Sequence, residues 1–208
     1  MEESIRIEKL EKEKVAETVE VLLRAFKDEA FTRNWIDLSS EKMRGAYANA
    51  SRIKLLLSLE ADQPMFVAIE NQKVIGFVFL EYQNNRIRFL KLLGYLVTNL
   101  PMVFTLLPSF IKVFRKGARA MAPAKNLPDN YCTIQAIGVD PQHQGRKVGS
   151  RLLHYAHNFC RQHKEAKGIY LFTGDEKNKD IYEKIGYQLL ETRDTGGIMS
   201  WHLFYEKK

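Results

Sequence analysis

A strand, a glycine-bearing turn and the start of a helix follow one another in the second half of this sequence. Thr133–Val139 is a β-branched, apolar run typical of a buried strand. Asp140-Pro141 ends the run, because proline has no N–H to donate to a sheet. The turn Gln144–Ser150 follows, and apolar residues then recur at the spacing of one helix face, at Leu152, Leu153, Ala156, Phe159 and Cys160. The first N–H groups of a helix lack partners within it, and the helix dipole adds about half a positive charge there, so this arrangement suits a phosphate.

The turn also indicates which kind of phosphate it would bind. Arg146 and Lys147 place two formal positive charges at the start of the helix, which favours a diphosphate. The two common nucleotide fingerprints, G-x-x-x-x-G-K-[ST] and G-x-G-x-x-G, are both absent from the chain. A phosphate loop of another kind, binding ATP or a dinucleotide, stays an alternative.

The turn resembles the acyl-CoA loop of the GCN5-related N-acetyltransferase (GNAT) superfamily. That loop reads Val-x-Pro and then [Gln/Arg]-x-x-Gly-x-[Gly/Ala], which Val139-Asp140-Pro141 and Gln144–Gly149 match with one exception. The exception is Lys147, where the family usually has glycine. Glycine tolerates a positive φ and lysine does so only with strain, so the backbone at Lys147 either stays right-handed or is strained. The Lys147 ammonium could in return pair with a phosphate of CoA.

A second motif of the same superfamily lies downstream. Gly168–Phe172 has the composition of a short buried strand. After it come Asn178, Tyr182 and Gly186, which resemble the family's asparagine after the fifth strand, its tyrosine-bearing helix and its closing Gly-[Phe/Tyr]. Residues four apart share a helix face, so Asn178 and Tyr182 are expected to point into one cleft. Gly186 suits the left-handed end of that helix.

The resemblance implies an α/β fold with a mixed, mostly antiparallel sheet of six to seven strands flanked by helices. In this fold the fourth and fifth strands splay apart to admit acetyl-CoA, the acyl donor. Carried over to this sequence, the cofactor-binding residues are Ile137, Gly138, Val139, Gln144, Gly145, Arg146, Lys147, Val148, Gly149, Ser150 and Asn178. Backbone N–H groups near Ile137–Val139 would stabilise the oxyanion. Tyr182, with an ordinary pKa of about 10, would donate a proton or a hydrogen bond to the departing thiolate.

The implied reaction is acetyl transfer to a primary amine by direct attack in a ternary complex. The amine must first lose a proton, and the family often uses a carboxylate on the fourth strand for this step. Asn130–Val139 contains no carboxylate, and Gln135, where one might be sought, cannot take a proton. Glu81, Asp175 and His143 are candidates that would act through water, although each is also typical of a surface or turn residue. A non-catalytic acyl-CoA-binding module is therefore a second possible function.

Metal chemistry is not indicated by the sequence. His154 and His157 are spaced as on one helix face, but no neighbouring Asp, Glu or Cys completes a ligand set, so we expect both to face solvent. Cys132 and Cys160 are the only cysteines, and we expect both to be small buried side chains without a disulfide. The first four residues are acidic and begin no apolar segment, so no secretory signal is visible and the cytoplasm is the expected compartment.

At 208 residues, the chain suits a single acyltransferase domain (1–208) with an insertion at about 84–128, between the third and fourth strands. The net charge of +7 equals the seven cations of this insertion, which has no acid up to Arg119: Arg86, Arg88, Lys91, Lys112, Arg115, Lys116 and Arg119. No basic motif interleaved with aromatics is present, so nucleic acid is not an expected partner.

The insertion contains an uncharged run, Leu92–Ile111, long enough on paper to cross a bilayer. Pro101 and Pro108 interrupt it, and a span would leave two strands of one sheet on opposite sides of a membrane. Two apolar helices, Ile87–Asn99 and Met102–Arg119, are expected instead. They could form a structural layer or homodimer surface, a lid over the acceptor, or an anchor on a membrane surface.

The remaining patterns place the other elements. Phe31 and Trp35, in the linker Lys27–Ser40, could line an acceptor pocket or pack two helices together. The acceptor itself, a small-molecule amine or a peptide, is left open by the sequence. We expect strands at Ile5–Leu10, Pro64–Glu70, Lys73–Tyr82, Gln188–Thr192 and Ser200–Tyr205, and helices at Glu11–Ala25 and from Ser39 or Ser40 to about Glu60.

Overall fold

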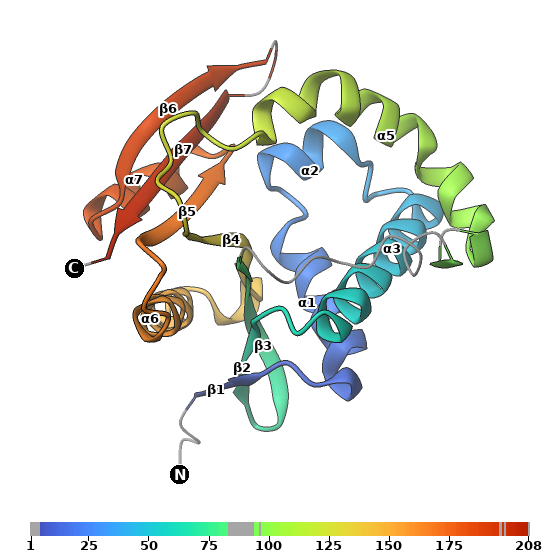
Figure 1. The fold of residues 1–208 in the computed structure, drawn as a ribbon. Coiled ribbons are helices and arrows are strands. Elements are labelled where there is room, and N and C mark those ends of the chain that lie inside the picture. The colour runs from blue at the N-terminus through green and yellow to red at the C-terminus, as the bar shows by residue number, and fades with distance from the viewer. Residues whose placement is uncertain (1–4, 83–93, 96, 196, 198, 208) are drawn as a thin grey trace.

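A computed structural model describes the whole chain except residues 1–4, 83–93, 96, 196, 198 and 208. One seven-stranded sheet, in the order β1-β2-β3-β4-β5-β7-β6, runs through the molecule (Figure 1). Every neighbouring pair is antiparallel except β4 and β5. The strands are β1 (Arg6–Lys9), β2 (Met65–Glu70), β3 (Lys73–Tyr82), β4 (Cys132–Val139), β5 (Gly168–Thr173), β6 (Gln188–Asp194) and β7 (Met199–Glu206). The predicted mixed, mostly antiparallel sheet is confirmed.

Helices cover both faces of this sheet. Those described are α1 (Val15–Ala25), α2 (Ala30–Trp35), α3 (Glu41–Glu60), α5 (Leu100–Met121), α6 (Val148–Gln162) and α7 (Glu176–Lys184), with short 3-10 turns at Lys12–Lys14 and Pro141–His143. On one face, α1 and α3 bury their apolar sides against β2 and β3. On the other face, α6 packs Val148, Leu152 and Ala156 against the central strands. The separation follows from strand alternation, since successive side chains of β3 enter opposite cores.

Local signals explain most element boundaries. The β2–β3 hairpin turns at Asn71 and Gln72, both with positive φ (49° and 62°), so the turn forms without glycine. Ser40 caps α3, because its Oγ accepts a hydrogen bond from the Met43 N–H at 3.4 Å. Cys132 and Cys160 are both buried and form no disulfide, as expected.

The linker between α1 and α3 differs from the prediction. It contains α2, a six-residue helix whose N-cap Glu29 accepts a hydrogen bond from the Thr32 N–H at 2.9 Å. A helix this short carries too few turns to show an apolar period, so sequence periodicity missed it.

The insertion is partly described. The predicted helix at Ile87–Asn99 lies largely outside the described residues, whereas the second one is present as α5. Pro101 lies in the first turn of α5, where a missing N–H costs nothing, and the helix continues through Pro108. Met102 and Leu106 pack on α3 in a small separate core. Among the residues that the structure describes, no helix is long and apolar enough to cross a membrane.

Candidate active site

The site forms where β4 leaves β5. The two strands pair in parallel at only two positions, Cys132 with Ile169 and Thr133 with Tyr170. Beyond Thr133 the strands diverge, and Ile137–Val139 stays partly exposed although it remains paired with β3 on its other side. Gly138 is required here for packing, because a Cβ on it would stand 2.6 Å from the Phe77 ring. The splay therefore exposes backbone groups of β4 between two strands of a continuous sheet.

The turn after β4 presents the start of α6 to this splay. Lys147 is the N-cap residue and has φ 61°, in the left-handed region. Of the two possibilities left open by the sequence, the strained one is therefore found, at a cost of about 1–2 kcal/mol. No side chain caps α6, so the first-turn N–H groups of Val148, Gly149 and Ser150 are not taken up by a capping side chain. The Val148 side chain is buried in the core, so its contribution to an anion site is its N–H.

Arg146 does not simply project toward a ligand. Its guanidinium donates to both carboxylate oxygens of Glu70, at 2.8 and 2.6 Å. Hydrogen bonding from Arg146 lowers the pKa of Glu70, so this carboxylate is ionised at neutral pH. His143 Nε2 lies 3.7 Å from the same carboxylate. The pair ties the turn to the end of β2 and leaves Lys147 as the cation at the helix start.

Asp140 ends β4 and also forms an ion pair with Arg24 of α1. Its side chain is almost fully buried, and Oδ2 accepts from Arg24 Nε and Nη2 at 2.9 and 2.6 Å. Burial alone would raise the pKa of Asp140, but the hydrogen bonds from Arg24 and from the Gln142 N–H lower it overall. Asp140 thus links α1 to the end of β4 and fixes the direction in which the turn leaves the sheet.

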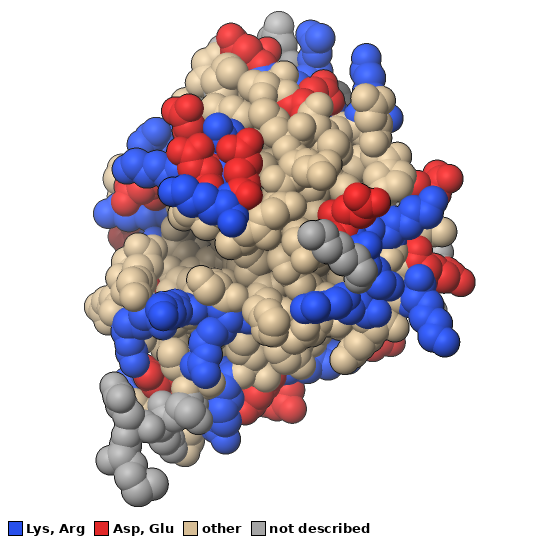
Figure 2. Space-filling model, turned by 90° about the vertical axis from the view of Figure 1, so that its left-hand side faces the viewer, with Lys and Arg blue, Asp and Glu red and all other residues tan. Residues whose placement is uncertain are grey.

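The space-filling view in Figure 2 shows a hollow in the face of the molecule turned toward the viewer. Lys and Arg side chains gather above and below it, and Asp and Glu side chains lie among those above. The cations around the hollow favour a ligand that carries negative charge.

Helix α7 brings the second motif to the site. Asp175 caps it by accepting from the Lys177 N–H at 2.9 Å, and Gly186, with φ 100°, follows its end. Asn178 lies within the first turns of α7 rather than ahead of it, but Asn178 and Tyr182 still share one face, and both are half-buried. Burial raises the pKa of Tyr182 to about 12, so its hydroxyl keeps its proton at neutral pH.

Two histidines behave differently from each other. His154 is exposed, as predicted, but His157 is not: its Nε2 lies 3.0 Å from the Tyr187 hydroxyl and its ring stacks on Tyr205 with centroids 4.2 Å apart. Burial lowers the pKa of His157 to about 4, so the ring is neutral at pH 7. Within the described part of the chain, no group of three His, Cys, Asp or Glu side chains could hold a metal ion.

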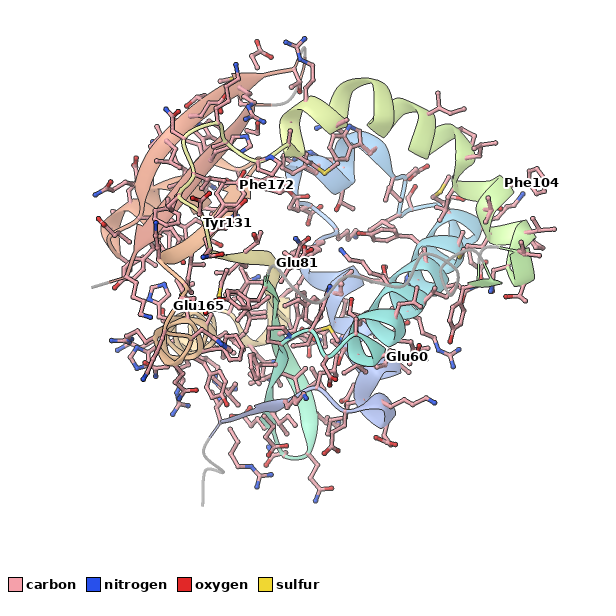
Figure 3. All side chains as sticks on the ribbon, viewed as in Figure 1. Glu60, Glu81, Phe104, Tyr131, Glu165 and Phe172 are labelled. Carbon is pink, nitrogen blue, oxygen red and sulfur yellow. The ribbon has the colours of Figure 1, made fainter. Side chains whose placement is uncertain are left out.

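β4 carries no carboxylate in Cys132–Val139, but its neighbour β3 does. Glu81 pairs directly opposite Thr133, and Gln135 Nε2 donates a hydrogen bond to Glu81 Oε2. The other two candidates have different partners: Asp175 caps α7, and His143 lies beside Glu70. Figure 3 shows Glu81, Tyr131 and Phe172 close to one another in projection, near the point where β4 leaves β5.

Aromatic side chains border the same region from α2. The Phe31 ring lies 5.7 Å from Phe172 at the end of β5 and 4.9 Å from Trp35. All three are partly accessible, so they both pack α2 against the sheet and present aromatic surface. The Lys54 side chain on α3 is exposed. The protein atoms around its ammonium nevertheless displace part of the water near it, and this lowers the pKa of Lys54.

Residues 23–187 match the model of the Acetyltransferase (GNAT) family. This chain belongs to the GNAT acetyltransferase family. Three similar solved structures cover nearly all of it. One is described as histone acetyltransferase HPA2 and related acetyltransferase from Corynebacterium glutamicum (14% identity, TM-score 0.68, 99% of this chain and 97% of that one). Another is the PaiA N-acetyltransferase of Thermoplasma acidophilum in complex with coenzyme A (17%, 0.60, 98% and 99%). A third is the ribosomal-protein-S18-alanine N-acetyltransferase of Escherichia coli (13%, 0.57, 99% and 95%).

Family membership makes this protein an acyltransferase, and the acyl donor of the GNAT family is acetyl-CoA. The residues present fit that donor. The uncapped start of α6 and the Lys147 ammonium suit a pyrophosphate, while the unpaired edge of β4 suits an extended amide-bearing arm. The identities to the solved structures are too low to carry over an acceptor.

Proposed function

We propose that this GNAT protein transfers an acetyl group from acetyl-CoA to a primary amine by direct attack in a ternary complex. The observation that supports the proposal is the splay of β4 from β5, because β4 has no pairing with β5 beyond Thr133 and this edge leads to the uncapped start of α6. The amine nitrogen forms a bond to the thioester carbon, and the C–S electron pair leaves with sulfur. N–H groups of Ile137–Val139 would stabilise the charge that develops on the carbonyl oxygen.

Tyr182 would act on the departing sulfur as a hydrogen-bond donor. Its pKa of about 12 lies about three units above that of an ordinary thiol, so complete transfer of its proton to a thiolate would be unfavourable. A hydrogen bond to a charged acceptor nevertheless contributes about 1.5–3 kcal/mol. We therefore assign Tyr182 to stabilising the thiolate, with solvent supplying the proton after release.

A binding measurement tests the donor. Acetyl-CoA should bind in isothermal titration calorimetry and raise the unfolding temperature, whereas ATP and NAD should do neither. Stabilisation by ATP or NAD alone would remove the proposal and favour a nucleotide-binding loop. Binding of acetyl-CoA with no acetyl transfer to any amine in a broad panel would favour the non-catalytic acyl-CoA-binding module.

For the acceptor, we propose a small primary amine with an apolar or aromatic body rather than a peptide. Support comes from the partly accessible rings of Phe31, Trp35 and Phe172 beside the splay. A panel of aryl-alkyl amines, polyamines and peptides, assayed by release of free CoA thiol, distinguishes these classes. Faster turnover of peptides or polyamines than of aryl-alkyl amines would contradict the proposed acceptor.

One observation favours a second candidate, an acetyltransferase that associates with a membrane surface. Five large apolar side chains on and just before α5 are exposed at alternating spacings of three and four residues: Val97, Leu100, Phe104, Leu107 and Ile111. The sequence between residues 84 and 119 has no acid, which would favour anionic lipid. Flotation with vesicles containing anionic lipid tests this. Recovery of the protein in the unbound fraction would remove the candidate.

A further inference from the structure

The splay contains one carboxylate whose place in the sheet is unusual. Glu81 is on β3, directly opposite Thr133 of β4. Thr133 is also the last residue of β4 that pairs with β5. Glu81 therefore lies beside the point where the two strands begin to diverge, although it belongs to neither of them.

A β-bulge turns a second side chain toward Glu81. Leu80 pairs with Ile134 while Phe79 pairs with Ala136, so Gln135 is the extra residue on β4. Bulges re-aim a side chain and recur next to active sites. Here the exposed Gln135 amide donates to one oxygen of Glu81, which orients the carboxylate and leaves its other oxygen for a further donor.

The spacing along β4 relates this carboxylate to Ile137–Val139. Gln135 precedes Ile137 by two residues, or about 6.6 Å at about 3.3 Å per residue. That separation is longer than a hydrogen bond, so a carboxylate bound to the Gln135 side chain would reach an amine beside Ile137–Val139 through water.

Other elements contribute charge around Glu81. Lys54 faces it from α3, and the negative charge of Glu81 opposes the burial that lowers the pKa of Lys54. Tyr131 faces it from the segment before β4, where burial and then the charge of Glu81 raise the pKa of its hydroxyl. Lys54, Tyr131 and the Gln135 amide therefore all face Glu81.

We propose that Glu81 is the general base of the acetyl transfer and that Gln135 is its positioning residue. This inference rests on the proposed function. The acceptor arrives as an ammonium ion and gives one proton to the Glu81 carboxylate through water. The lone pair that is freed forms the N–C bond, and the nitrogen loses its second proton to solvent as the C–S bond breaks. The sulfur keeps the electron pair of that bond and takes a proton from solvent after release. The proton on Glu81 also passes to solvent, so the base is regenerated.

Glu81→Gln is the decisive variant, with Glu60→Gln and Glu165→Gln as matched controls on the outside of the molecule (Figure 3). Loss of a general base lowers the rate by about 10²–10⁴-fold. We expect kcat/KM of Glu81→Gln to fall by that amount at pH 7 and to recover as the pH rises, because the free amine then deprotonates in solution. The Kd for acetyl-CoA should stay within about twofold, and both controls should match the wild type.

Gln135→Ala tests the positioning role through a double-mutant comparison. Without the hydrogen bond from the Gln135 amide, the Glu81 carboxylate is no longer oriented, so Gln135→Ala should lower kcat while Glu81 is present and leave the Kd for acetyl-CoA nearly unchanged. In the Glu81→Gln background the same change should have little further effect, because the group that Gln135 positions is absent. A residue that only supported the strand would lower activity equally in both backgrounds, and that result would remove the positioning role.

The outcomes separate this inference from the proposed function. If the wild type transfers acetyl to no amine, the proposed function fails, and the assignment of Glu81 fails with it. If the wild type is active and Glu81→Gln equals it at every pH, only the assignment of Glu81 is overturned. A variant that loses acetyl-CoA binding together with activity would also overturn it, because Glu81 would then support the donor site.

Discussion

At the scale of single residues, the turn before α6 departs from the family pattern at one position. Lys147 occupies a glycine position and adopts a left-handed backbone, so it accepts strain while adding a cation to the start of α6. Arg146, by contrast, donates two hydrogen bonds to Glu70. If the turn binds phosphate as proposed, we expect Lys147 to contribute more to the affinity than Arg146.

Lys147→Gly should separate strain from affinity. We expect the free energy of unfolding without ligand to rise by about 1 kcal/mol, because glycine adopts φ 61° without a Cβ penalty. Affinity for acetyl-CoA should fall several-fold, since a cation beside the phosphates is lost. Urea unfolding and calorimetry measure the two effects. Lys147→Met is the control, as it removes the charge and keeps the strain. If Lys147→Met were stabilised as much as Lys147→Gly, loss of the cation at the helix start would explain the gain and the strain would not.

Tyr182→Phe tests whether the tyrosine hydroxyl stabilises the departing sulfur. The variant removes only this hydroxyl, whose pKa is about 12 and which is therefore protonated at neutral pH. A hydrogen bond to a thiolate contributes about 1.5–3 kcal/mol, so its loss should lower kcat by about 10–150-fold. The Kd for acetyl-CoA should stay nearly unchanged. Tyr155→Phe, on α6 and partly exposed, is a suitable control. Equal activity of Tyr182→Phe and the wild type in steady-state assays would remove this role.

At the scale of elements, α5 has a packed face and an exposed face, which should contribute very differently to the free energy of unfolding. Leu106 is 3% exposed and packs on α3, whereas Phe104 is 67% exposed and points outward (Figure 3). Leu106→Ala should lower the free energy of unfolding by about 2–5 kcal/mol through lost burial and a cavity. Phe104→Ala should change it by less than about 0.5 kcal/mol. Comparable losses in both variants, measured by urea unfolding, would mean that the outward face of α5 is covered.

The sequence predicted the elements with strong local signals and missed relations between elements. The strand, turn and helix around Gln144–Ser150 follow from apolar periodicity and proline chemistry, and they appear as predicted. Glu81 was only a weak candidate, because its importance depends on register: a bulge on β4 brings Gln135 to a carboxylate on β3. His157 was expected in solvent, since no local pattern shows that Tyr187 and Tyr205 pack around it. Long-range pairing decides both cases.

At the scale of the whole molecule, two buried histidines make the fold sensitive to acid. Burial lowers the pKa of His157 and of His202 to about 4 each, from an ordinary value of about 6.5. His202 is fully buried, and its ring nitrogens lie 2.6 Å from the Tyr170 hydroxyl and 3.2 Å from Ser200 Oγ. Both rings are therefore neutral in the folded protein at pH values where an unfolded chain would protonate them.

The sign of the effect follows from proton binding. Between about pH 6.5 and 4, the unfolded chain binds more protons than the folded one, so stability falls as the pH falls through this window. Each histidine lowers the free energy of unfolding by about 2 kcal/mol between pH 6.5 and 5, at 1.36 kcal/mol per pKa unit.

Urea unfolding at pH 7 and pH 5 should show that the free energy of unfolding falls by about 4 kcal/mol. His157→Gln should remove about half of that pH dependence, whereas His154→Gln, at an exposed position on the same helix, should leave it intact. An identical slope in His157→Gln would show that His157 is charged or exposed in the folded protein, and the packing of α6 against Tyr187 and Tyr205 would need revision.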